Sequence, residues 1–157
     1  MRDMEFILRF FALSSDVYRQ DKRESISLKR FLDVFMKNNA NPSEEVLLSF
    51  QRRFANAVQF IHETFGTSAF HNISPSDPNK LVPKFSPTLF DSIAIAADYA
   101  LRSANFAYTS DHPEESRRVL LQDKDYRFAI SKETMTKSCI NTRISKACKY
   151  LFGLNYE

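Results

Sequence analysis

The fold class is decided by residues 43–66, SEEVLLSFQRRFANAVQFIHETFG. Their apolar side chains recur at the spacing of one face of an α-helix, over about six turns. Ser43 can cap the start of this helix, where Glu44 and Glu45 suit the helix dipole. Gly66 can end it, because glycine readily adopts the left-handed conformation that follows many helices. The apolar face comprises Leu47, Phe50, Phe54, Ala57, Val58, Ile61 and Phe65.

The same spacing predicts helices on both sides of this stretch. We expect them to begin near residues 3, 27, 86, 111, 123 and 136, with Ser27, Ser86 and Thr136 as caps. Residues 16–26 are polar and residues 67–86 contain three prolines, so both are predicted to be loops. The predicted fold class is therefore all-α, an irregular bundle of about five to seven helices in a single domain, residues 1–157.

The composition agrees with helices and limits the possible function classes. Fifteen Phe and only two Gly suit helices packed through large side chains, and argue against β-rich folds and glycine-rich phosphate loops. Cys139 and Cys148 lie about 13 Å apart along one predicted helix, too far for a disulfide. No apolar run approaches the roughly 20 residues that span a bilayer, and the N-terminus lacks a basic signal-peptide start. We therefore expect a soluble, cytoplasmic protein with reduced thiols and no membrane contact.

The motifs that carry chemistry are incomplete. Residues 62–66, HETFG, begin like the zinc-binding HExxH motif, but Gly66 stands in place of the second histidine. Asp91 and Asp98 share one helical face but lie about 10 Å apart, and we interpret them as acids on a solvated face. No cysteine has an activating base nearby in sequence. The sequence thus predicts no catalytic residue, no metal ligand and no cofactor, and hence no enzyme activity of the chain alone.

Positive charge is concentrated near the C-terminus. Residues 116–157 contain nine Lys or Arg and four Asp or Glu, whereas residues 67–115 contain three and six. Three cations of the last predicted helix should form an exposed ridge, with two more nearby. Such a ridge could contact nucleic-acid phosphates, although charged runs are more often simply solvated. The candidate residues are Arg127, Lys137, Arg143, Lys146 and Lys149.

The first predicted helix carries two apolar stripes. Met4, Ile7, Leu8 and Phe11 form one of them. A helix that is apolar on two sides is usually buried between other elements. Finding one so close to the start of the chain suggests a domain that completes something larger. We expect the second stripe to be buried or to form a partner interface, made by Phe6, Phe10 and Leu13.

Several segments, in this order, resemble one family. They are Arg2-Asp3-Met4-Glu5-Phe6-Ile7-Leu8-Arg9-Phe10-Phe11-Ala12-Leu13, Leu28-Lys29-Arg30-Phe31-Leu32, Met36-Lys37-Asn38-Asn39, Phe65-Gly66-Thr67-Ser68-Ala69-Phe70, Leu89-Phe90-Asp91-Ser92-Ile93 and Arg143-Ile144. Together they resemble the helical C-terminal half of GmrSD-type, ParB-like nuclease proteins, a family long classed as a domain of unknown function (DUF). The resemblance covers nearly the whole chain. The Asp-Gly-Gln-Gln-Arg signature of the N-terminal ParB-like catalytic domain is absent, His71 stands where an Arg is expected, and Ser86-Pro87-Thr88 departs from an expected Asn-containing turn.

The resemblance implies a role in restriction or phage defence for an intact two-part protein. This chain would be a non-catalytic helical domain that supports a ParB-like nuclease half, in cis or from a neighbouring gene, and could contact DNA. The alternative is a free-standing helical module for protein interaction or homo-oligomer formation, with no nucleic-acid role. An upstream reading frame that encodes Asp-Gly-Gln-Gln-Arg would distinguish the two.

Overall fold

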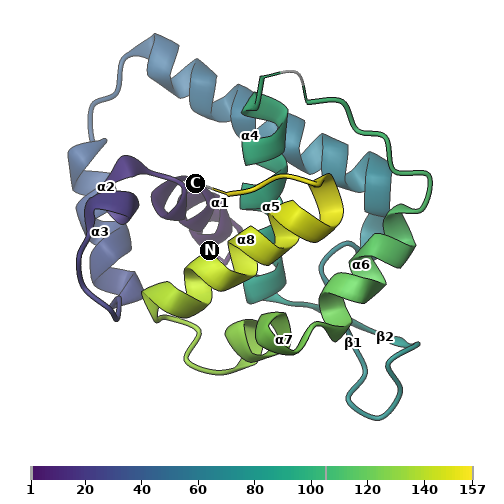
Figure 1. Ribbon diagram of the computed structural model, residues 1–157. Helices are drawn as coiled ribbons and strands as arrows, with labels where there is room; N and C mark the ends of the chain where they lie inside the picture. Colours follow the sequence, from purple (N-terminus) through teal and green to yellow (C-terminus); the bar gives the residue numbers. More distant parts are fainter. Residues whose placement is uncertain (1, 105, 157) are drawn as a thin grey trace.

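The computed structural model describes residues 2–104 and 106–156, with only the backbone of residues 2 and 3. These residues form eight α-helices, one short 3-10 helix and one two-stranded antiparallel sheet (Figure 1). The fold is therefore mostly helical rather than purely all-α, and it has one helix more than the upper limit predicted. The elements are α1 (Arg2–Leu13), α2 (Asp16–Gln20), α3 (Leu28–Asn38), α4 (Glu44–Phe65), η1 (Gly66–Ser68), β1 (His71–Ile73), β2 (Leu81–Phe85), α5 (Pro87–Arg102), α6 (Pro113–Gln122), α7 (Lys124–Ser131) and α8 (Lys137–Phe152).

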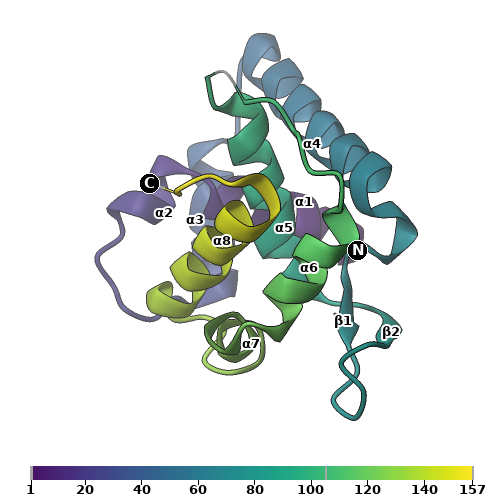
Figure 2. The same ribbon diagram turned by 45° about the vertical axis from the view of Figure 1, so that its right-hand side comes forward.

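Helix α5 is the centre of the molecule. Every side chain from Leu89 to Asp98 is buried. Helices α8, α4 and α1 all pack against it, and α8 crosses in front of it in Figures 1 and 2. Alanines supply much of its surface, which lets these neighbours approach closely. One continuous hydrophobic cluster runs from α1 to α8 through this helix.

The local signals for helix ends are largely confirmed. The side chains of Ser43, Ser86 and Thr136 each accept a hydrogen bond from a backbone N–H in the first turn of the helix that follows. Ser27 occupies the cap position of α3 but makes no such bond. Gly66 and Gly153 both have positive φ, at 66° and 67°, where a side chain would be strained. These ends depend on contacts within a few residues, which is why they are readable from sequence.

Two segments predicted to be loops contain regular structure. Within residues 67–86, β1 and β2 pair as a hairpin that projects from the helices in both ribbon views. Its turn is closed by hydrogen bonds from Ser74 N to Lys80 O and from Lys80 N to Asp77 O, at 2.7 and 3.0 Å. Within residues 16–26, the short helix α2 forms because Tyr18 is buried and donates a hydrogen bond to Asn141 in α8. Both elements depend on contacts with distant residues, so the polar local sequence did not predict them.

Within the described ranges, no helix combines the length and the apolar character that crossing a bilayer requires.

Candidate partner-binding groove

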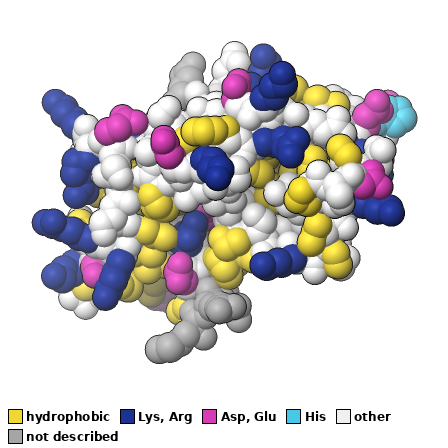
Figure 3. Space-filling view, turned by 90° about the horizontal axis from the view of Figure 1, so that it is seen from below, with side chains coloured by type: hydrophobic (Ala, Val, Ile, Leu, Met, Phe, Trp, Pro, Cys, Tyr) yellow, Lys and Arg dark blue, Asp and Glu magenta, His cyan; other side chains and the backbone are white. Residues whose placement is uncertain are grey.

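An apolar groove of about 790 Å³ lies between α1, α3 and the start of α4. Its deepest side chains, Phe11, Leu32 and Phe35, are nearly covered, whereas its outer apolar side chains remain largely exposed. Met4 is 70% exposed, Met36 is 47% exposed and Leu47 is 53% exposed. Figure 3 shows hydrophobic side chains gathered on the face seen from below, beside a row of Lys and Arg side chains at its left edge. The groove is thus an apolar surface that the residues described by the structure leave uncovered.

The groove exists because α1 carries two apolar stripes and only one of them faces α5. Phe10 and Leu13 are fully buried in the core, and half-buried Phe6 packs against the rings of Phe85 and Phe90. The prediction that Phe10 and Leu13 are buried is therefore confirmed. The alternative, that they belong to a partner interface, is wrong for these two residues. The other stripe, Met4, Ile7, Leu8 and Phe11, lines the groove instead.

Polar side chains lie at the edge of the groove. The groove is lined by three exposed charged side chains, Glu5 on α1 and Lys29 and Asp33 on α3. The Glu5 carboxylate lies 3.6 Å from the guanidinium of Arg9, one turn along α1. Apolar walls with few charges at the rim are typical of surfaces that bind another protein segment.

The basic ridge predicted on α8 does not form, because Arg143 is buried rather than exposed. Its guanidinium lies 3.3 Å from a carboxylate oxygen of Asp91, and it donates a 2.6 Å hydrogen bond to the Thr134 carbonyl. Burial lowers the pKa of Arg143, because leaving water penalises the charged form, although Asp91 opposes this effect. The prediction that Arg143 is exposed is wrong. Its ion pair with Asp91 on α5 offsets the cost of removing the guanidinium group from water.

Asp91 and Asp98 are also buried, so their interpretation as acids on a solvated face is wrong. Asp91 accepts hydrogen bonds from Nε and Nη2 of Arg9, with Nε at 2.9 Å. Asp98 accepts from Arg53 Nη2 at 2.7 Å and from Arg102 at 3.0 Å. Asp91 thus joins Arg9 of α1 and Arg143 of α8 to the central helix, and Asp98 joins Arg53 of α4 to it, since Arg102 lies on α5 itself. These acids therefore belong to structural ion pairs.

The other predicted basic residues divide into engaged and exposed groups. Lys146 Nζ contacts Asp123 at 2.8 Å and Asp125 at 3.0 Å, and these hydrogen bonds raise the pKa of Lys146 to about 12. Lys137 donates to the carbonyl of Asp21 at the end of α2. Arg127 and Lys149 are exposed. Among the residues that the structure describes, only these two of the five candidates present a positive charge to solvent without an ion-pair or hydrogen-bond partner.

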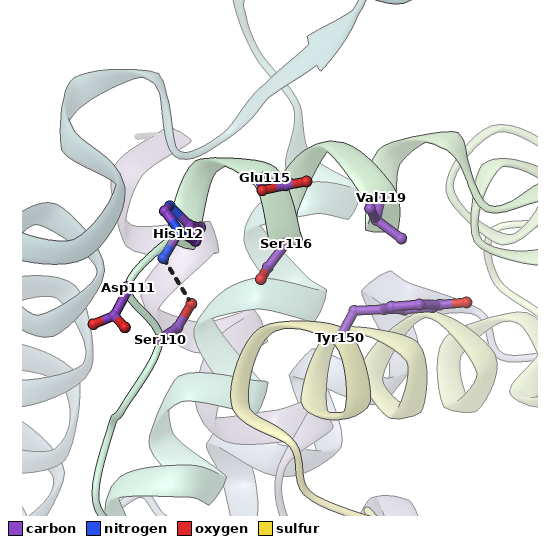
Figure 4. Close-up of a pocket in the computed structure, with 7 residues that line it drawn as sticks. All are labelled: Ser110, Asp111, His112, Glu115, Ser116, Val119 and Tyr150. Atoms are coloured by element: carbon purple, nitrogen blue, oxygen red, sulfur yellow. Dashed lines mark hydrogen bonds between the residues drawn. The ribbon is translucent and has the colours of Figure 1, made fainter.

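A smaller depression of about 430 Å³ collects polar groups at the start of α6 (Figure 4). Ser110, Asp111 and His112 precede the helix, and Tyr150 on α8 forms the other side. The bond drawn in Figure 4 joins the His112 backbone N–H to Ser110 Oγ at 3.3 Å, so it is a turn contact rather than a serine–histidine pair. In the part of the chain that the structure describes, no three His, Cys, Asp or Glu side chains are grouped to hold a metal ion.

Comparison with known protein families, with curated proteins and with solved structures finds no match to this chain.

Proposed function

We propose that this chain is a non-catalytic helical domain of a GmrSD-like restriction or phage-defence protein, and that it supports a ParB-like nuclease half. The observation that carries the proposal is the uncovered apolar groove. Three helices present apolar side chains to it, and burying such surface stabilises a complex by about 25 cal/mol per Å² before the costs of association. A supporting domain needs such a surface.

The position of the groove favours the ParB-like half as its occupant. In the family that the chain resembles, the catalytic half precedes the helical half. Met4 and Glu5, in the first turns of α1, line the groove. A half that precedes α1 would therefore be connected at the groove itself, which keeps its effective concentration there high.

The test is binding between this chain and the ParB-like half, taken from the same or a neighbouring reading frame that encodes Asp-Gly-Gln-Gln-Arg. We expect the two to co-purify. Met36→Lys combined with Leu47→Glu should abolish co-purification, because both substitutions place charge in the groove. Each also suits the dipole at its own helix end, so the fold should be retained.

The matched control is Leu101→Lys combined with Val119→Glu. Leu101 and Val119 are 42% and 48% exposed, and neither lines the groove. The control pair should co-purify as the unaltered chain does. Equal binding by all three proteins, at equal melting temperatures, would remove the groove from the proposal. The alternative, an interaction module with no such partner, would gain if no reading frame with the signature is found.

A further inference from the structure

The walls of the groove restrict what can occupy it. All three are α-helices, whose backbone N–H and C=O groups are bonded internally except at the ends. An extended segment in the groove would therefore bury its own backbone polar groups without partners, which is costly. A helix satisfies these groups internally and presents only side chains.

The arrangement of the three helices around the groove also suits a further helix. Floor helix α1 is flanked by α3 on one side and by the start of α4 on the other. A helix is roughly 10–12 Å across with its side chains, and packed helices lie about 8–10 Å apart. The groove therefore resembles the position of a missing helix in a bundle.

Helix α4 supports this interpretation. None of its first ten residues, 44–53, is buried. Leu47 and Phe50 nevertheless line the groove. The Phe50 ring stacks on Phe11, with ring centroids 4.6 Å apart, whereas Leu47 is 53% exposed, so this half of the helix has an apolar face that is packed only in part. Most helical stability in proteins comes from packing an apolar face. A helix in the groove would supply that packing.

We infer that the groove holds a single amphipathic helix of the ParB-like half, an inference that rests on the function proposed above. Its apolar side chains would recur at i, i+3, i+4 and i+7, facing Phe11, Leu32 and Phe50. Basic side chains on its flank would face Glu5 and Asp33, and an acidic side chain would face Lys29, fixing its direction. A second copy of the chain is a poorer occupant, because two-fold pairing of this face brings two concave surfaces together and fills neither.

Site-directed cross-linking tests the inference. Met36→Cys and Leu47→Cys each place a thiol on a different wall, for reaction with a maleimide photo-cross-linker. Both native cysteines, Cys139 and Cys148, are buried, and burial raises the pKa of Cys148 to about 12, so they should react slowly. Val119→Cys is the control, because Val119 is 48% exposed, like Met36 at 47%, but lies outside the groove.

The cross-links are mapped in the intact or reconstituted two-part protein. We expect both groove positions to reach one helical segment of the ParB-like half, at residues spaced by three, four or seven, and Val119→Cys to give none. Cross-links to a strand, to separate segments or between two copies would overturn the helix while leaving the supporting function intact. Failure of the two parts to associate at all would remove the proposed function and this inference together.

Discussion

At the scale of single residues, the most consequential contact is that of Asp91 with Arg9 and Arg143. All three side chains are buried, so the group contains two positive charges and one negative charge. A buried charge is tolerated only when it is paired and hydrogen-bonded. Asp91 is thus the one anion that stabilises both guanidinium groups between α1, α5 and α8.

Replacing Asp91 by Asn should therefore be strongly destabilising. It leaves the buried Arg143 guanidinium without a counter-charge and Arg9 with only the exposed Glu5 carboxylate at 3.6 Å, and breaking a buried ion pair typically costs about 3–5 kcal/mol. We expect this loss in the free energy of unfolding measured with urea. The matched control is Asp125→Asn, because the Asp125 side chain is 73% exposed and its contact with Lys146 should contribute at most about 1 kcal/mol. Similar losses in both variants would show that the buried ion pairs of Asp91 contribute no more to stability than the exposed pair of Asp125.

At the scale of elements, α1 separates two roles on one helix. On its face toward α5, Phe10 and Leu13 are fully buried and Phe6 is half-buried, whereas Met4 on the groove face is 70% exposed. The two faces are offset by about half a turn, since side chains repeat every 3.6 residues. A single helix can therefore contribute both to the core and to the proposed interface.

The pair Phe10→Asp and Met4→Asp tests this division. Phe10 is fully buried, so the new carboxylate would be an unpaired buried charge and should cost several kcal/mol, roughly. Met4 is 70% exposed, so the same change there should alter stability by no more than about 0.5 kcal/mol. Thermal melting of both variants checks the prediction. A melting temperature for Phe10→Asp equal to that of the unaltered chain would contradict the structure.

At the scale of the whole molecule, part of the excess positive charge of residues 116–157 is used internally. Arg143 is buried with Asp91, Lys146 is paired with two aspartates, and Arg117 is buried against Ser68 and Glu114. A basic composition is therefore a weak guide to a nucleic-acid surface here. The exposed candidates, Arg127 and Lys149, lie on neighbouring helices, α7 and α8.

A DNA contact of the two-part protein, as the resemblance implies, should thus depend on Arg127 and Lys149. Replacing both by Glu should weaken binding and reduce the slope of log affinity against log salt by about 1.8, since each phosphate contact contributes about 0.9. The control reverses two exposed charges on α3, Arg30→Glu with Lys37→Glu, and gives the same change in net charge. Binding titrations at several salt concentrations distinguish them. An equal loss in both pairs would indicate a general charge effect.

The local features of this protein were determined by its sequence. The apolar period of residues 43–66, the serine and threonine caps and the two positive-φ glycines act over one or two helical turns. Such interactions need no distant partner. This is why the helical class and most helix ends were predicted correctly, and also why both cysteines were correctly expected to be unpaired.

The tertiary structure decided which side of each element faces the core. Periodicity indicates that α1 has two apolar stripes but not which of them is covered. The second stripe was therefore expected to be buried or to form a partner interface, and only the structure shows that Phe10 and Leu13 lie in the core. The burial of Arg143 depends on Asp91, 52 residues away, and that of Asp91 also on Arg9, 82 residues away. A charged side chain is predicted to be exposed when its partner is unknown, because only pairing offsets the cost of removing the charge from water. The groove likewise exists only once α1, α3 and α4 have been brought together.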